Sequence, residues 1–291
     1  MNWQDIATAI ERATGRAPGE LRVASRGGGC INEAWLLDDG ERRFFVKANT
    51  ASSLEMFEAE AEGLHELRKA DAIRVPEPIA TGVSGRNAWL VMEALPLGAS
   101  PDPTRFGEQL ARMHEYHAPH YGWHRDNTIG STPQPNGWMD DWVAFLRERR
   151  LGFQLELARS RGLDPRTVAV GERLLESLPA FFDSPPAASL LHGDLWRGNV
   201  GGLPDGSPAI FDPAVYYGDA EADLAMTELF GGFGEPFFAA YRAVRPISPD
   251  YPTRRTLYNL YHILNHYNLF GGGYDSQADN MIRQLLAEAG A

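Results

Sequence analysis

Apolar residues near the start of the chain recur at helical spacing and then give way to short extended runs. The first pattern predicts a helix over residues 2–14. Two apolar runs, residues 34–37 and 43–47, flank an Asp-Asp-Gly turn signal and predict a β-hairpin. A second helix is expected over residues 53–70, and residues 88–93 have the composition of a buried strand.

The pattern changes after this strand. Residues 94–103 are rich in Pro and Gly and predict a hinge between two lobes. We therefore expect an N-lobe over residues 1–93, a helical C-lobe over residues 104–291, and a ligand cleft between them. Short strands are expected in the C-lobe only at 189–191 and 208–211, and helices near 104–118, from 142 onward, and at 166–181, 220–230, 235–243, 253–269 and 276–289.

Charge and composition narrow the range of partners. The 291 residues carry a net charge of −12, so the chain lacks the basic excess that nucleic-acid binding needs. A local cluster of backbone N–H groups with one lysine could still hold a phosphate. No apolar run approaches the roughly 20 residues that cross a bilayer, and the N-terminus does not have the pattern of a signal peptide. We expect a cytoplasmic protein that binds neither nucleic acid nor membrane.

The most informative motif lies at residues 191–200, Leu-His-Gly-Asp-Leu-Trp-Arg-Gly-Asn-Val. It has the form H-x-D-L-x-x-x-N, the pattern of a kinase catalytic loop. The Asp of such a loop accepts the proton of the attacking hydroxyl, and the Asn coordinates magnesium. This pattern predicts that Asp194 is catalytic and that Asn199 is a metal ligand in the nucleotide site.

A second acidic residue follows an apolar strand in Ile-Phe-Asp-Pro, at residues 210–213. Asp212 takes the place of the kinase D-F-G aspartate, which holds magnesium between the β- and γ-phosphates. A carboxylate suits this role because magnesium is a hard cation that prefers oxygen ligands. We expect Asp212 to be the second metal ligand.

A lysine closes the predicted hairpin strand at residues 43–47. Lys47 can neutralise the α- and β-phosphates of a nucleotide, provided that a carboxylate orients it. The pattern F-x-x-E-x-x-x-L in the following helix favours Glu60 as that partner. Glu58 and Glu62 are expected on the solvated face of the helix.

Three glycines, residues 27–29, precede Cys30 and lie ahead of the lysine strand. Backbone N–H groups approach phosphates closely where side chains are absent, although a triple glycine alone is more often a flexible turn. Cys30 is the only cysteine, so an intramolecular disulfide is impossible. It is interpreted as a small buried residue or, alternatively, as a redox switch that joins two molecules. A monomer and a homodimer both remain open.

Taken in order, these motifs predict an α+β, two-lobed protein-kinase-like fold. Its small N-lobe would hold an antiparallel sheet plus a helix, and its larger C-lobe would be mainly helical. The run His-Gly-Asp-Leu-Trp-x-Gly-Asn, followed by an apolar strand and Asp-Pro-Ala, resembles the fructosamine (ketosamine) kinases, which are related to aminoglycoside phosphotransferases. The resemblance covers about residues 20–288, and further matching stretches are GGGCIN at 27–32, VPEP at 75–78, VME at 91–93, GEQLARMH at 107–114, DDW at 140–142, DPAVYYGDAEADLAM at 212–226, FGGF at 230–233 and NHYNLFGGGY at 265–274.

The resemblance implies an ATP- and Mg²⁺-dependent kinase. Its members phosphorylate the sugar 3-hydroxyl of a small-molecule or protein-bound ketosamine, and the phosphorylated adduct then releases the free amine. Such an activity repairs glycated lysines and amines. Within that scheme Asp194 would be the base, Asn199 and Asp212 would hold magnesium, and Lys47 with Glu60 would hold the α- and β-phosphates.

The resemblance also implies contacts at the rest of the nucleotide. Gly28 and Gly29 would cover the triphosphate. Backbone groups of Met92, Glu93 and Ala94 would face the adenine edge.

Four further residues are expected to act around the catalytic motif. Trp196 is interpreted either as a platform for the sugar ring or as an aromatic brace of the loop. His266 could contact the substrate, but a satisfied core histidine is the simpler interpretation. Asp223 is expected to accept N–H bonds from the catalytic loop, and His192 to pack beneath it.

The same motifs are compatible with three other functions. A phosphotransferase for an aminoglycoside or a choline-like amine would use the same scaffold. A pseudokinase that only binds ligands is disfavoured because all the chemistry residues are present. A protein kinase is disfavoured because only ten residues separate Asp212 from Asp223, which leaves no room for a long activation loop.

Overall fold

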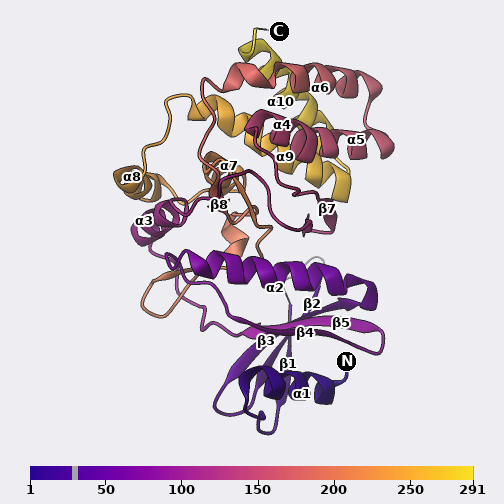
Figure 1. Ribbon diagram of the computed structural model, residues 1–291, viewed down its shortest axis with the longest axis vertical. Helices are drawn as coiled ribbons and strands as arrows, with labels where there is room; N and C mark the ends of the chain where they lie inside the picture. Colours follow the sequence, from indigo (N-terminus) through magenta and orange to yellow (C-terminus); the bar gives the residue numbers. More distant parts are fainter. Residues whose placement is uncertain (28–31, 291) are drawn as a thin grey trace.

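The computed structural model describes residues 1–27 and 32–290 and shows two lobes stacked along the long axis of the molecule (Figure 1). The predictions for Gly28, Gly29 and Cys30 lie outside the described residues. The predicted α+β, kinase-like architecture is confirmed, with a five-stranded antiparallel sheet and a helix in the N-lobe and a mainly helical C-lobe. No helix in the described part of the chain is both long and apolar enough to cross a membrane.

The N-lobe is built on a sheet of strand order β1-β2-β3-β5-β4, in which every neighbouring pair is antiparallel. The helix α1 (Trp3–Thr14) lies below this sheet in Figure 1, and α2 (Leu54–Lys69) lies above it, between the sheet and the C-lobe. The strands are β1 (Arg22–Arg26), β2 (Glu33–Asp38), β3 (Arg43–Thr50), β4 (Pro78–Ser84) and β5 (Asn87–Glu93).

Strict alternation along β3 decides which side chains face which helix. Phe44, Val46 and Ala48 pack with α1 in a small core of their own. Lys47 points to the opposite face, toward α2, and is buried there. The alternation along β3 therefore places the Lys47 side chain toward the cleft and its neighbours Val46 and Ala48 in the core beside α1.

The two lobes are joined by residues 94–102, which form neither helix nor regular strand. The N–H groups of Gly98 and Ala99 both donate to the carbonyl oxygen of Gly202, at 3.1 and 3.3 Å. The linker is thereby held against a short hairpin of the C-lobe.

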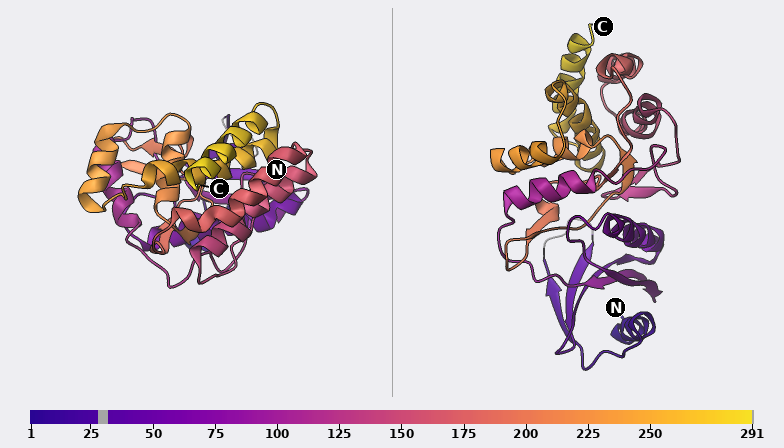
Figure 2. Two further views of the ribbon diagram at one scale, coloured as in Figure 1. Left: turned by 90° about the horizontal axis from the view of Figure 1, so that it is seen from above. Right: turned by 60° about the vertical axis from the view of Figure 1, so that its left-hand side comes forward.

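The C-lobe contains two helical groups, visible in the second view of Figure 2. In one, α3 (Pro103–Met113) packs closely on α8 (Glu235–Val244) at Gly107, where an added Cβ would lie 2.1 Å from the Phe237 carbonyl oxygen. The remaining helices are α4 (Trp142–Phe145), which continues through a π-helical segment (Leu146–Leu151) into α5 (Gly152–Ser160), then α6 (Pro165–Ser177), α7 (Glu221–Leu229), α9 (Tyr251–Phe270) and α10 (Tyr274–Glu288).

The expectation of only two short strands in the C-lobe was wrong. Beside β8 (Ser189–Leu191) and β10 (Pro208–Ile210), the described chain has four more, each of three residues: β6 (Asn127–Ile129), β7 (Thr132–Gln134), β9 (Val200–Gly202) and β11 (Tyr216–Gly218). Three residues are too few to show a period of two, so their pairing is decided by tertiary contacts.

The helix α2 is also attached to the C-lobe, which the sequence did not indicate. Glu62 accepts hydrogen bonds from His124 at 2.9 Å and from Arg125 at 2.5 Å, and Tyr217 donates to Glu66 at 2.7 Å. Glu62 still lies on a solvated face of the helix, with 44% of its side chain exposed, but the sequence did not indicate its partners, which lie 62 and 63 positions away.

Candidate active site

Three charged residues meet between the lobes. The Lys47 ammonium lies 2.5 Å from Glu60 Oε1 and 2.6 Å from Asp212 Oδ1. Burial favours the neutral form of Lys47, but the two carboxylates outweigh it and raise the pKa of the ammonium. Burial raises the pKa of Glu60, and Lys47 offsets only part of this. The site therefore holds a permanent positive charge fixed between an N-lobe helix and a C-lobe loop.

The loop after β8 carries the second group. Asn199 Nδ2 donates to the backbone carbonyl of Asp194 at 2.9 Å and to its carboxylate at 3.1 Å. Burial raises the pKa of Asp194 to about 7, the Asn199 hydrogen bond opposes this, and the charges of Asp212 and Asp223 add to it. A carboxylate with a pKa near neutral can both accept and return a proton under physiological conditions.

A buried network fixes the backbone of this loop. The Asp223 carboxylate accepts hydrogen bonds from the N–H groups of His192, at 2.7 Å, and of Gly193, at 2.9 Å. It also faces His114 Nε2 at 3.3 Å, and Tyr241 lies 2.8 Å from the other ring nitrogen of His114. Burial alone would raise the pKa of Asp223, but these partners lower it. His114 was not predicted, because it stands 109 positions from Asp223, at the residue after α3, in a segment with no catalytic motif.

His192 connects the catalytic loop to the following acidic segment. Its Nε2 donates to the carbonyl oxygen of Phe211 at 2.9 Å, and its Nδ1 accepts the Asp194 N–H at 3.2 Å. Burial lowers the pKa of His192, so the ring is neutral. These contacts link the segments that carry Asp194 and Asp212, and the expected role of His192 as a support of the catalytic loop stays a prediction.

The donor set around Asp212 suits a hard cation. The Asn199 amide uses its nitrogen for Asp194 and for the Asp212 carbonyl, at 3.4 Å, so its oxygen is the free end. Asp212 is one of two described non-glycine residues with positive φ, at 59°, and its side chain is 46% exposed. One carboxylate oxygen is paired with Lys47, which leaves the other for a metal. Both residues thus present an oxygen of the kind that magnesium prefers.

The predicted adenine contacts of Met92, Glu93 and Ala94 stay a prediction, but two of their N–H groups already have partners. The Glu93 N–H donates to the Glu77 carbonyl at 2.8 Å, and the Ala94 N–H donates to the Arg43 carbonyl at 3.2 Å. These two donors are therefore in use within the sheet. Within the described chain, the Leu95 N–H makes no such bond and is the next donor along the hinge.

Trp196 and His266 belong to one group of aromatic side chains beside the catalytic loop. The Trp196 indole is 38% exposed and lies over Gly198, where an added Cβ would be 2.3 Å from the ring. His266 Nδ1 lies 2.7 Å from the His262 carbonyl oxygen. Phe230 lies between the two aromatic residues, with ring centroids 6.1 Å from Trp196 and 5.0 Å from His266. Their contact with a substrate stays a prediction.

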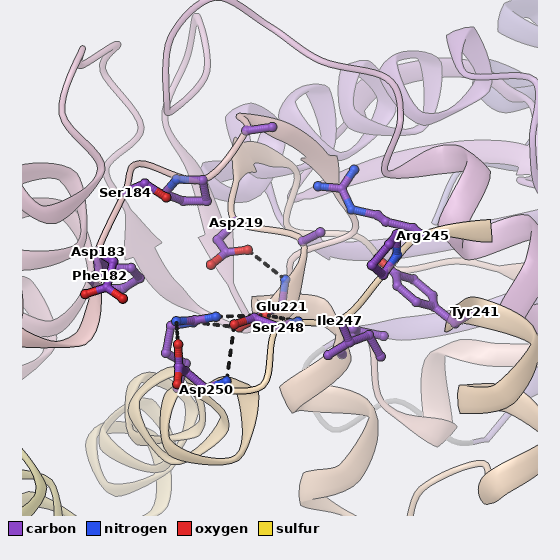
Figure 3. Close-up of a pocket in the computed structure, with 16 residues that line it drawn as sticks. Phe182, Asp183, Ser184, Asp219, Glu221, Tyr241, Arg245, Ile247, Ser248 and Asp250 are labelled. Carbon is purple, nitrogen blue, oxygen red and sulfur yellow. Dashed lines mark hydrogen bonds and ion pairs between the residues drawn. The ribbon is translucent and has the colours of Figure 1, made fainter. Parts of the chain in front are cut away.

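A pocket of about 330 Å³ lies elsewhere in the C-lobe (Figure 3). Its wall includes Asp219 and the buried pair of Glu221 with Arg254, whose closest atoms are 2.7 Å apart. None of the residues that line it belongs to the catalytic loop or to the Lys47 group. Its lining carries more acidic than basic side chains, and the groups suited to a nucleotide lie instead in the cleft, where the Lys47 group meets the catalytic loop.

Comparison with known proteins agrees with this geometry. The family model for fructosamine kinase matches residues 2–288. A probable ketoamine kinase of Synechocystis is 48% identical over 288 residues, covering 98% of this chain and 97% of the relative. A chloroplastic protein-ribulosamine 3-kinase of Oryza sativa subsp. indica is 44% identical over 277 residues, covering 94% and 81% of the two chains.

Solved structures show the same fold. A putative fructosamine-3-kinase from Haemophilus somnus superposes with a TM-score of 0.90 at 30% identity, covering 98% of this chain and 97% of that one. An aminoglycoside phosphotransferase, APH(4)-Ia, in a ternary complex with ADP and hygromycin B, has a TM-score of 0.62 at 14% identity, covering 99% of both chains. The second likeness concerns the fold alone.

Proposed function

Because the chain belongs to the fructosamine kinase family, we propose that it transfers the γ-phosphoryl group of ATP to the sugar 3-hydroxyl of a ketosamine. The observation that carries the proposal is the meeting of Lys47, Glu60 and Asp212 beside the Asp194–Asn199 pair. The products are ADP and a phosphorylated ketosamine, which then breaks down and releases the amine.

Lys47 would bind the nucleotide's phosphates. In the described structure its ammonium is already oriented by Glu60, so little ordering is needed when ATP binds. The Leu95 N–H would donate to the adenine ring, in place of the Ala94 N–H that the sheet already uses.

Asp194 would orient the acceptor hydroxyl and take its proton. Its pKa of about 7 matches that task, and the hydrogen bond from Asn199 fixes one carboxylate oxygen. Asp212 and Asn199 would hold Mg²⁺, which neutralises charge on the transferring phosphoryl group when bound. Most of the rate enhancement would then come from positioning and charge neutralisation, since phosphoryl transfer needs little covalent chemistry from the protein.

The acceptor would be a free or protein-bound ketosamine. Only ten residues separate Asp212 from Asp223, and the described chain has no helix or strand between them apart from β11 and the start of α7. A modified lysine that protrudes from a protein could reach such a site without a peptide-docking segment. The cytoplasm remains the proposed compartment, although the rice relative is named as chloroplastic.

The proposal is tested by measuring ADP release with Mg²⁺–ATP and a panel of acceptors. The panel contains fructosyl-lysine, ribulosyl-lysine, choline and kanamycin, and Asp194→Asn is the control. We expect turnover on at least one ketosamine and its loss in the variant. Turnover on choline or kanamycin alone would refute the proposed acceptor class while leaving the fold assignment intact.

A further inference from the structure

Five aromatic side chains form a continuous surface beside the catalytic loop, which we call the aromatic shelf. They come from the loop itself, from the end of α7, and from the junction of α9 with α10. Ring centroids are 6.1 Å apart for Trp196–Phe230, 5.0 Å for Phe230–His266, 5.7 Å for His266–Phe270 and 5.2 Å for His266–Tyr274.

The shelf is open to solvent. Phe270 is 60% exposed, the highest value among the large hydrophobic side chains of the described chain, and Trp196 and Phe230 are 38% and 37% exposed. Glycines follow the aromatic residues at both turns, and a Cβ added at Gly231, Gly271 or Gly272 would meet nothing within 4 Å. Exposed aromatic surface of this extent, left uncovered by the neighbouring chain, is typical of a binding site.

The shelf begins at the reacting group. Trp196 is two residues from Asp194, and its indole is pressed against Gly198 of the same loop. The Phe230 ring lies between Trp196 on this loop and His266 on the facing helix α9. From His266, the rise of 1.5 Å per residue places Phe270 about 6 Å further along α9. A sugar hydroxyl at Asp194 would therefore leave the rest of a ketosamine directed along the shelf.

The chemistry of the shelf suits the nitrogen of that substrate. A ketosamine is a secondary alkylamine and is protonated near neutral pH, and aromatic faces attract such cations. The cation–π pairs of the described residues involve Arg42, Arg150 and Arg254 with other rings, so none occupies a shelf residue. His266 donates through Nδ1 to the His262 carbonyl, which leaves Nε2 as an acceptor for an N–H or O–H of the substrate.

We propose that the aromatic shelf is the subsite for the amine-bearing half of the acceptor, and that it selects a cationic secondary amine over a neutral substituent at the same position. This inference rests on the proposed function. It makes Phe230 and Phe270 specificity-determining residues, whereas Asp194 and Lys47 serve any acceptor equally.

The test compares two acceptors that differ at a single position, in the charge and in the N–H groups of the nitrogen. One is a ribulosamine formed from a simple alkylamine, and the other is the matching ketose ether, with oxygen in place of N–H. The full-length protein is assayed for kcat/KM with each acceptor, as wild type, Phe270→Leu, Phe270→Tyr, and Phe230→Leu with Phe270→Leu. Leucine keeps the apolar area and removes the aromatic face, and tyrosine keeps the face. Thermal unfolding of each variant checks that it folds.

We expect the wild type to prefer the amine, and Phe270→Leu to lose about three- to fivefold in kcat/KM on the amine alone. The double variant should lose more, and Phe270→Tyr should retain the preference. Equal losses on both acceptors, or no loss in the double variant, would overturn the cation-selecting role while the kinase activity stands. Wild-type turnover of neither acceptor would instead remove the proposed function, and this inference with it.

Discussion

Replacing Asp194 by Asn should stabilise the folded protein at pH 8 while abolishing the proposed phosphoryl transfer. The reason is that burial disfavours the ionised carboxylate and raises the pKa of Asp194 from its ordinary 3.8 to about 7. An asparagine has nearly the same shape, carries no charge, and can still accept the hydrogen bond that Asn199 donates at 3.1 Å. Stability is thus given up at this position for reactivity.

The size of the effect follows from the two pKa values. The folded protein binds more protons than the unfolded chain between pH 3.8 and about 7, so wild-type stability falls as pH rises through that window and is constant above it. At about 1.4 kcal/mol per pKa unit, the full gap corresponds to about 4 kcal/mol. Because the Asp194 side chain is only half-buried, water screens part of this cost. We expect Asp194→Asn to raise the free energy of unfolding by about 2 kcal/mol at pH 8 and by much less near pH 4.

The assay is urea unfolding of both proteins between pH 4 and pH 8, in the presence of a chelator and without nucleotide. Comparing the midpoints and slopes gives the difference in unfolding free energy at each pH. Taking the difference between wild type and variant cancels the titration of all other groups.

A matched control comes from Asp223, a second buried aspartate near the same loop. Its pKa is lowered, because His114 and the backbone N–H groups of His192 and Gly193 bind the carboxylate. Asp223→Asn brings an amide N–H₂ against these donors and should destabilise the protein by about 2–4 kcal/mol. An Asp194→Asn variant that is less stable than wild type at pH 8, or whose gain does not change with pH, would refute the reasoning.

Two further substitutions test other parts of the structure. Lys47→Met leaves Glu60 and Asp212 without their shared cation. We expect the KM for ATP, measured by ADP release, to rise at least about tenfold, and the free energy of unfolding, measured in urea at pH 8, to fall by about 3 kcal/mol. An unchanged KM would contradict the phosphate-binding role. Gly107→Ala places a Cβ 2.1 Å from a backbone carbonyl oxygen of α8 and should lower the free energy of unfolding by about 1–3 kcal/mol. Gly98→Ala has open space at its Cβ and should change the urea midpoint little. Equal effects of the two substitutions would refute the close packing of α3 on α8.

Contacts between site residues that lie close together in sequence could be predicted from the sequence alone. Asp194 and Asn199 are five positions apart on one loop, and their contact needs no information from elsewhere in the chain. The choice of Glu60 also followed from local information, since the helical period decides which carboxylate faces the strand that carries Lys47.

The remainder depends on contacts between distant segments. His114 reaches Asp223 across 109 positions, and Glu62 reaches Arg125 across 63, and neither pair has a motif that marks it. The Leu95 N–H is a candidate adenine donor because the Ala94 N–H already donates to the Arg43 carbonyl, which the sequence alone does not show. Sequence reasoning therefore anticipated the N–H bonds that Asp223 accepts from the catalytic loop, but not the contacts of His114 and Glu62 with distant segments; the chemical roles of the site residues stay predictions.

The double attachment of α2 has a consequence for control of the enzyme. In many kinases this helix swings, and its position switches the Lys–Glu pair on and off. Here the same helix is bonded to β3 through Glu60 and to the C-lobe through Glu62 and Glu66. An outward swing would break all three contacts together and would therefore cost more than loss of the Lys–Glu pair alone. We expect such a helix to favour the position that pairs Lys47 with Glu60, so that output follows the supply of acceptor.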